Sequence, residues 1–379
     1  GFDVSHDTSR LRLGMTGRAE YRDYRDDRFD DTVDATMDAR LGWSIVPERL
    51  DFVAEDRLTL QPVDTLAPDS PGNRQQVNVL SAGPSLRFRW GGHWDGVADL
   101  RWVRSTAEIS DEFNSKRLDL GLRATRALTT TTDLSFHLQG QRVTFDDEAI
   151  ARDYDRYDVF ARLSRRLARV DTAIDLGWSR LGYRRDLPGF ASSRSDPLLR
   201  AEVAWRPNES HRLMVRGSSL FSDVAEDALT GIDVDGGIPG GVVSGNTVVN
   251  ASPFLERRLD TEYSYTSTRW SVSVSPFATR LRYSDTDAFD QDGWGVGLEG
   301  MWRMRRTLTL GGAASLDHNR YLNLDREDET RRYTVYLRYD RARHWSASLG
   351  WTRYERSSNA PGVDAQQDVF GFTLTWRNR

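Results

Sequence analysis

The sequence predicts an all-β protein, a transmembrane antiparallel up-and-down β-barrel of about 18 strands formed by one domain over residues 1–379. Three observations predict this fold. Strand-length segments alternate apolar and polar residues, the gaps between them alternate short and long, and most tryptophans lie beside the short gaps. Because successive side chains of a strand point to opposite faces, such segments suit a wall with lipid outside and water inside.

The alternating segments follow one another along the chain with almost no helical periodicity. In residues 32–46, for example, Val33 and Leu41 share one face, whereas Asp56 interrupts the apolar face of residues 50–63. An even number of strands is typical of bacterial single-chain barrels. We expect strands near residues 10–24, 32–46, 50–63, 76–91, 93–108, 115–127, 131–145, 154–168, 170–184, 196–207, 211–222, 253–267, 269–284, 293–304, 307–321, 329–341, 344–356 and 367–377.

Short and long gaps alternate between these segments. Gaps such as 47–49 and 342–343 are very short, whereas the intervening ones, such as 146–153 and 285–292, are longer. Outer-membrane barrels have short periplasmic turns and longer extracellular loops. We therefore expect both chain ends in the periplasm, with residues 1–9 as a periplasmic N-terminal segment.

Tryptophan positions agree with this orientation. Of the twelve tryptophans, eight lie beside a short gap or at the end of the chain. Because Trp side chains favour the headgroup level of a membrane, these eight predict an aromatic girdle at the periplasmic interface. They are Trp43, Trp90, Trp94, Trp205, Trp270, Trp302, Trp345 and Trp376.

The last segment has the form of a closing strand. Phe372, Leu374 and Trp376 alternate with smaller or polar residues, as in the C-terminal signal that the barrel-assembly machinery reads during biogenesis. The chain departs from that signal by continuing through residues 377–379 beyond the last aromatic residue. We expect this strand to pair with the strand near residues 10–24 and so to close the wall.

Composition excludes several classes of protein. The chain has no cysteine, which excludes disulfides and thiolate metal sites, and its net charge of -5 gives no electrostatic case for nucleic acid binding. The sequence contains no run of 18 apolar residues and therefore predicts no transmembrane helix. The chain starts at Gly1 without Met or a signal peptide, so we expect a mature protein of the outer membrane of a Gram-negative bacterium with its signal peptide removed.

No motif indicates an enzyme, a cofactor or a metal centre. The six histidines lack the spacing of a zinc site, and Ser, His and Asp form no nucleophile motif. Acidic clusters such as Asp285, Asp287, Asp290 and Asp292 raise the possibility of calcium, but no full ligand spacing follows them. We interpret them as solvated loops.

Charged side chains of both signs occupy the face that would line the lumen. They predict cross-strand ladders that stiffen the wall, and equally a polar conduit whose charges set selectivity. The lumen-lining candidates are Asp38, Arg40, Asp99, Arg101, Asp119, Arg123, Asp158, Arg162, Arg200, Glu202, Arg258, Asp260, Glu262, Arg338 and Asp340.

The longest gap, residues 223–252, mixes glycines with apolar residues. Loops of this length are usually functional or disordered. Its apolar content predicts packing against the protein, so we expect a constriction or plug folded into the barrel, with a surface docking site as the alternative. The core of the predicted plug is Gly236, Gly237, Ile238, Pro239, Gly240 and Gly241.

Two parts of the chain resemble a known barrel family. The first is Leu60-Gln61-Pro62-Val63-Asp64 followed by Pro68-Asp69-Ser70-Pro71-Gly72-Asn73-Arg74; the second is the C-terminal third, including Asp292-Gly293-Trp294-Gly295-Val296. Both resemble the outer-membrane β-barrel proteins associated with exosortase (PEP-CTERM) and exopolysaccharide gene clusters. The resemblance implies a role in polysaccharide export or surface assembly and carries over no catalytic residue.

The leading functional hypothesis is therefore a conduit or assembly component for export of an exopolysaccharide or another surface polymer. The alternatives are a general or substrate-selective diffusion porin, and a non-conducting scaffold barrel that binds a periplasmic or surface partner. The expected partners are outer-membrane lipid and lipopolysaccharide, the barrel-assembly machinery and periplasmic polysaccharide-export proteins.

Overall fold

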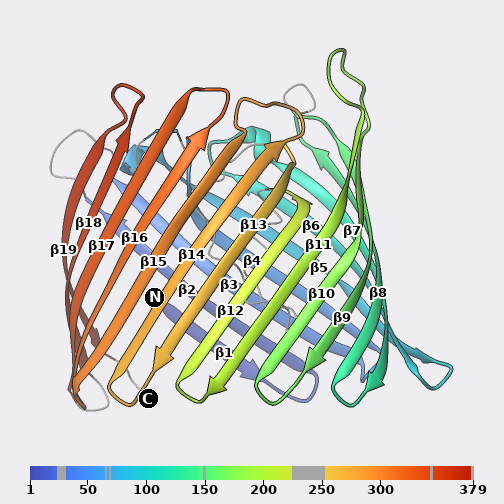
Figure 1. The fold of residues 1–379 in the computed structure, drawn as a ribbon, viewed down its shortest axis with the longest axis horizontal. Coiled ribbons are helices and arrows are strands. Elements are labelled where there is room, and N and C mark those ends of the chain that lie inside the picture. The colour runs from blue at the N-terminus through green and yellow to red at the C-terminus, as the bar shows by residue number, and fades with distance from the viewer. Residues whose placement is uncertain are drawn as a thin grey trace.

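The computed structural model describes residues 1–23, 31–64, 66–67, 70–147, 151–223, 252–341 and 345–376. Within these ranges the chain forms one sheet of 19 strands, in which each strand pairs antiparallel with the next along the sequence. Figure 1 shows this sheet curved into a barrel of tilted strands, with hairpin turns at one end and longer loops at the other. The predicted fold class is confirmed.

The strands and short helices have the following bounds. The first half of the chain contains β1 (Phe2–Asp7), β2 (Leu11–Arg22), β3 (Thr32–Val46), β4 (Leu50–Pro62), η1 (Pro71–Asn73), β5 (Arg74–Trp90), β6 (Trp94–Ala107), η2 (Asp111–Phe113), β7 (Ser115–Thr129), β8 (Thr132–Phe145), β9 (Tyr154–Arg166) and β10 (Val170–Tyr183). The second half contains β11 (Ser193–Asn208), β12 (His211–Ser222), β13 (Phe254–Thr266), β14 (Trp270–Tyr283), β15 (Gln291–Arg305), β16 (Leu308–Tyr321), β17 (Arg326–Arg341), β18 (Trp345–Ser358) and β19 (Ala365–Trp376). No helix in the described part of the chain is long and apolar enough to cross a membrane.

The strand count exceeds the sequence-based count because of β1. Residues 1–9 were expected to be a periplasmic segment, but residues 2–7 pair with β2 in a register that runs from Phe2 opposite Gly17 to Asp7 opposite Arg12. Six residues with two large apolar side chains are too short for alternation to identify a strand. β1 occupies the edge of β2 that does not pair with β3, so the expected pairing of the closing strand β19 with β2 is not formed in the described part of the chain.

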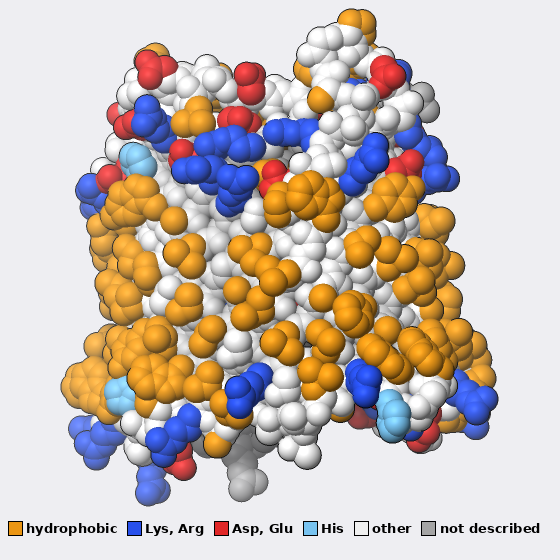
Figure 2. Space-filling model, turned by 45° about the vertical axis from the view of Figure 1, so that its right-hand side comes forward, with side chains coloured by type: hydrophobic (Ala, Val, Ile, Leu, Met, Phe, Trp, Pro, Cys, Tyr) orange, Lys and Arg blue, Asp and Glu red, His pale blue; other side chains and the backbone are white. Residues whose placement is uncertain are grey.

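The outer face of the barrel carries a broad band of hydrophobic side chains, with lysine and arginine side chains concentrated above and below it (Figure 2). On β7, Leu118, Leu120 and Leu122 contribute to this band, and each is 40–50% exposed. The eight tryptophans of the predicted girdle lie at the short-turn ends of their strands. Trp270 and Trp302 stack with ring centroids 5.0 Å apart, and Trp90 and Trp94 stack at 6.0 Å.

The inner face is packed with apolar side chains at the long-loop end. One buried cluster joins Val77, Val79, Val103, Phe113, Phe254, Leu281 and Tyr283, which come from β5, β6, η2, β13 and β14. A second cluster joins Val143, Phe145, Ala151, Tyr154, Leu181, Tyr183, Phe221 and Leu255. The first cluster brings together strands that lie far apart in the sheet, so the interior is filled at this end.

β5 and β6 approach each other closely at Gly83. A Cβ atom added there would overlap the carbonyl oxygen of Leu100, which is a backbone atom fixed within β6. We therefore expect Gly83→Ala to lower the free energy of unfolding by about 1–3 kcal/mol, measured by denaturant titration in detergent micelles. The control is Gly14→Ala, because nothing lies within 4 Å of its added Cβ. Equal losses at the two glycines would contradict the close approach.

Candidate functional site: the lumen and its closure at the long-loop end

A buried ion pair joins β7 to the residue that follows β12. The Arg117 guanidinium donates two hydrogen bonds of 2.5 Å to the Asp223 carboxylate, and the Tyr154 hydroxyl donates a third of 2.7 Å. The side chains of Arg117 and Asp223 are only 4% and 5% exposed. Burying two charges is tolerated when hydrogen bonds satisfy them. The first residue of the 223–252 gap is therefore fixed inside the barrel.

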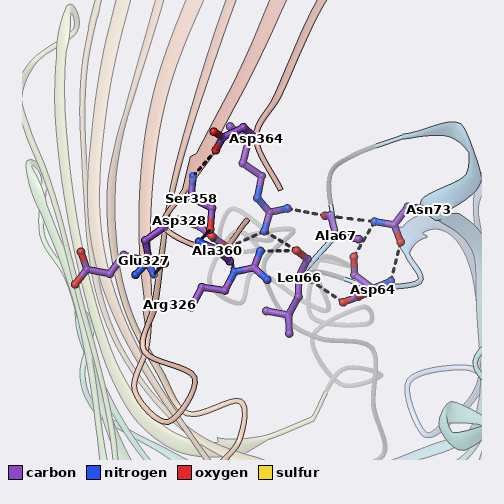
Figure 3. Close-up of polar contacts among 12 residues, drawn as sticks. Asp64, Leu66, Ala67, Asn73, Arg326, Glu327, Asp328, Ser358, Ala360 and Asp364 are labelled. Atoms are coloured by element: carbon purple, nitrogen blue, oxygen red, sulfur yellow. Dashed lines mark hydrogen bonds and ion pairs between the residues drawn. The ribbon is translucent and has the colours of Figure 1, made fainter. Parts of the chain in front are cut away.

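A second closure, which we call the loop latch, ties the loop after β4 to β17 and β18 (Figure 3). It comprises the carbonyl groups of Leu66 and Ala67 and the side chains of Arg326, Asp328 and Arg356. Arg356 donates a 2.6 Å hydrogen bond to the Ala67 carbonyl oxygen, and Arg326 donates one to the Leu66 carbonyl oxygen. Asp328 accepts hydrogen bonds from both arginines, at 2.7 and 2.9 Å. Because β4 is a neighbour of neither β17 nor β18 in the sheet, its loop reaches these strands across the interior of the barrel.

The loop presents its carbonyl groups to the latch because its own polar contacts hold it folded. The Asp64 amide donates to the Asn73 side-chain oxygen at 2.8 Å, and the Asn73 side-chain amide donates to the Asp64 carbonyl oxygen at 2.7 Å. The Leu66 amide donates to the Asp64 carboxylate at 2.8 Å, which is a local side-chain turn. Asp64 and Asn73 both belong to the stretch that carries the family resemblance.

Other inward contacts reinforce the closure. Arg156 donates to the Phe221 carbonyl oxygen at 3.0 Å, and Arg194 donates to the Tyr283 carbonyl oxygen at 2.9 Å. Arg152 pairs with Asp285 and also places its guanidinium carbon 3.8 Å from the centre of the Tyr183 ring. These arginines link walls and loops that are distant in the chain, so the closure does not depend on one contact.

The surroundings of Asp290, a loop residue at this end, shift the pKa of its carboxyl group. Burial raises the pKa of the Asp290 carboxyl, although the Tyr283 amide donates a 2.8 Å hydrogen bond to it and Arg282 lies 3.9 Å away, both of which lower the pKa.

In the described part of the chain, no group of three or more His, Cys, Asp or Glu side chains is arranged to hold a metal ion.

Away from the closure, the inner faces of the strands carry ion pairs. Three of the predicted lumen arginines, Arg40, Arg162 and Arg200, form ion pairs with carboxylates on neighbouring strands. Arg162 donates two hydrogen bonds to Asp175 at 2.6 and 2.8 Å, and Arg200 lies 3.3 Å from the same carboxylate. Arg40 pairs with Glu55 at 3.2 Å.

The remaining predicted lumen charges divide into three groups. Same-strand pairs are Arg101 with Asp99 at 3.3 Å, Arg258 with Asp260 at 3.0 Å and Arg338 with Asp340 at 3.0 Å. Cross-strand contacts are Asp38 with Arg57 at 3.8 Å, Asp260 with Arg216 at 2.6 Å and Asp158 with the Ser179 hydroxyl. Asp119, Arg123, Glu202 and Glu262 occupy the same face, opposite Gln141, His137, Arg216 and Met214 in register.

Aromatic rings lie beside several of these arginines. The Arg200 guanidinium lies 4.9 Å from the centre of the Phe160 ring, which also stacks on His137 with centroids 4.4 Å apart. Arg258 lies 5.3 Å from the Phe277 ring, and Arg332 lies 5.7 Å from the Tyr354 ring. The lumen therefore combines flat apolar surfaces with charged hydrogen-bonding groups, a combination that alternation alone did not predict.

The predicted plug core, Gly236 to Gly241, lies outside the described residues. The described residues on either side of this stretch, Asp223 and Ser252, are both buried. Asp223 is 3% exposed and Ser252 is 8% exposed. Both attachment points are thus buried at the long-loop end.

No protein-family profile and no curated protein sequence matches this chain. Solved structures match over almost all of it. The apoprotein form of the FrpB iron transporter from Neisseria meningitidis (F5-1 variant) has a TM-score of 0.59 at 11% identity and covers 99% of this chain and 71% of its own. The copper transporter OprC has a TM-score of 0.59 at 14% identity, with 99% and 69% covered.

A third similar structure is the open form of the ferric-catecholate import receptor Fiu from E. coli K12, with a TM-score of 0.51 at 10% identity and 100% and 72% covered. At these identities the similarity shows the fold alone. The class of protein that this fold defines is the large outer-membrane-type β-barrel.

Proposed function

We propose that the chain is a gated outer-membrane conduit for a hydrated polymer, and that its substrate class is an exopolysaccharide or another surface polymer on its way out of the cell. The observation that carries this proposal is the lumen, in which arginine–carboxylate pairs lie beside aromatic rings, as at Phe277 and Arg258. Aromatic faces pack against the apolar faces of sugar rings, while charged groups hydrogen-bond to hydroxyl groups. A lumen with both features suits a carbohydrate better than a simple ion.

The closure at the long-loop end adds gating to the proposal. A diffusion porin has an open, water-filled interior, whereas here the loop latch and the Arg117–Asp223 pair cross the interior. In the proposed orientation the long loops face the cell exterior. A polymer entering from the periplasm would therefore meet a polar channel first and a displaceable closure last.

A second candidate is uptake of a bound small molecule, because the similar structures described above are an iron transporter, a copper transporter and a ferric-catecholate import receptor. Both candidates need a gated barrel, and they differ in the direction and size of the cargo. Export further requires a periplasmic partner that delivers the polymer, and we propose a polysaccharide-export protein for that role. Placement in the outer membrane and delivery by the barrel-assembly machinery are parts of the same proposal.

Neutralising the loop latch is expected to open the barrel. The variant Arg326→Gln/Asp328→Asn/Arg356→Gln removes all three charges together, so no buried charge is left without a partner. In planar bilayers, the wild-type protein is expected to show rare and small conductance steps, and the triple variant long open events. The control is Arg338→Gln/Asp340→Asn, which neutralises an exposed lumen pair near the short-turn end and should stay closed.

The outcomes separate the candidate functions. Soluble exopolysaccharide fragments added on the short-turn side should block the current of the open variant, and failure to block it would contradict the polymer proposal. A large steady conductance in the wild type would favour the porin. A triple variant that stays silent, even after residues 224–251 are deleted, would favour the non-conducting scaffold.

A further inference from the structure

Two arginines face each other on the outer surface at the long-loop end. In the register of β13 and β14, Arg257 lies directly opposite Arg280, and both side chains project from the outer face. Like charges directly opposite each other in a sheet are destabilising. Their side chains are 52% and 54% exposed, so they can reach a common ligand. The pair therefore presents two adjacent guanidinium groups to the surroundings of the barrel.

The nearby carboxylates leave these arginines with donor capacity. Arg280 lies 3.2 Å from Asp292, which also accepts a 2.7 Å hydrogen bond from Arg282. Arg257 has Asp196 at 3.7 Å, beyond an ordinary hydrogen-bond length. Because each guanidinium carries five N–H donors, single shared carboxylates do not saturate them.

A shallow depression of about 660 Å³ lies beside the arginine pair and is lined by Leu199, Ser219, Arg257, Leu259, Ala278 and Arg280, among others. Its apolar walls are the outward side chains Leu199 and Leu259, which are 42% and 55% exposed. On the strand between these two leucines, the short side chain of Ser219 lines the depression, and Gly217 next to Leu259 has no side chain. The depression is thus a gap in the hydrophobic band.

We infer that this arginine-capped depression, formed by Leu199, Ser219, Arg257, Leu259 and Arg280, binds a phosphorylated lipid of the surrounding membrane leaflet. The phosphate lies between Arg257 and Arg280, and one acyl chain lies in the depression. Guanidinium groups bind phosphate through paired hydrogen bonds. Figure 2 shows arginine and lysine side chains directly above the hydrophobic band, at the level where lipid headgroups meet acyl chains. An inorganic anion would use the arginines but not the apolar walls.

The test is native mass spectrometry of the purified full chain in detergent, with diphosphorylated lipid A as the probe. Arg257→Gln/Arg280→Gln is expected to weaken binding at least tenfold. Gly217→Leu places an apolar side chain beside Leu259, at the border of the depression, without touching a charge, and is expected to weaken lipid binding as well. An added Cβ there has no neighbour closer than 3.9 Å, so the fold should tolerate it. The matched control is Arg142→Gln/Arg184→Gln, which removes two exposed arginines that pair with Asp155 at the same end of the barrel.

The source of the phosphate is tested in the same experiment. Dephosphorylated lipid A should bind the wild type at least tenfold more weakly than the diphosphorylated form, and millimolar inorganic phosphate should not displace the lipid. Equal binding of both lipids, displacement by inorganic phosphate, equal loss in the control variant, or full binding by either test variant would overturn the inference. None of these outcomes depends on what the barrel conducts.

Discussion

Replacing Asp223 with Ala is expected to lower the free energy of unfolding by about 3–5 kcal/mol. The substitution leaves the Arg117 guanidinium buried, 4% exposed, and without the carboxylate to which it donates two hydrogen bonds. It also removes the acceptor of the Tyr154 hydroxyl. An uncompensated buried charge costs far more than the ion pair contributes, so the loss should exceed that of any exposed pair. Guanidinium unfolding in detergent micelles, followed by tryptophan fluorescence, measures it.

Two further variants separate the cost of an unpaired charge from other causes. Arg117→Met/Asp223→Leu replaces both charges with apolar groups and should recover most of the lost stability, because the orphaned charge is gone. Asp95→Ala breaks the Arg89–Asp95 pair, whose side chains are 72% and 65% exposed, and should cost less than about 1 kcal/mol. If Asp223→Ala cost no more than Asp95→Ala, the pair would not be a buried closure.

The two faces of the wall could be predicted from the sequence because they depend on local geometry. A side chain two residues along a strand returns to the same face, so the placement of Asp99 and Arg101 inside and of Leu118 and Leu120 outside needs no tertiary information. Even the exception has a local explanation. Asp56, which interrupts an apolar outward face, accepts a 2.8 Å hydrogen bond from Asn78 on the adjacent strand.

The closure could not be predicted in this way because its partners meet only when the barrel has formed. Arg356 and Ala67 are 289 residues apart, and Arg117 and Asp223 are 106 residues apart. Val77 and Val79 looked like ordinary strand residues, yet they belong to a buried cluster that includes Phe254 from the other half of the chain. Alternation identifies which face a residue occupies, but not which distant residue it meets there.

A substitution on the outer face of the barrel tests whether this face contacts lipid. Leu120 lies on the outer face of β7, 50% exposed, between Lys116 and Arg126, the charged outward residues nearest it on this strand. Leu120→Arg is therefore expected to lower the free energy of unfolding from lipid bilayers by about 2–4 kcal/mol, because it places a charge near the middle of the apolar band.

The matched control places the same arginine on the other face of the wall. Gln139 lies on the inner face of β8, opposite Gly121 and Asp158 in register. Gln139→Arg should therefore change stability by less than about 1 kcal/mol, because the new charge stays in a polar lumen beside a carboxylate. If the two arginines cost the same, the band would not face lipid, and the barrel would have to be stabilised by a different environment. A difference between them would assign lipid and water to the two faces independently of the fold comparison. The arginine-capped depression and the gated lumen both require that assignment, one on each face of the wall.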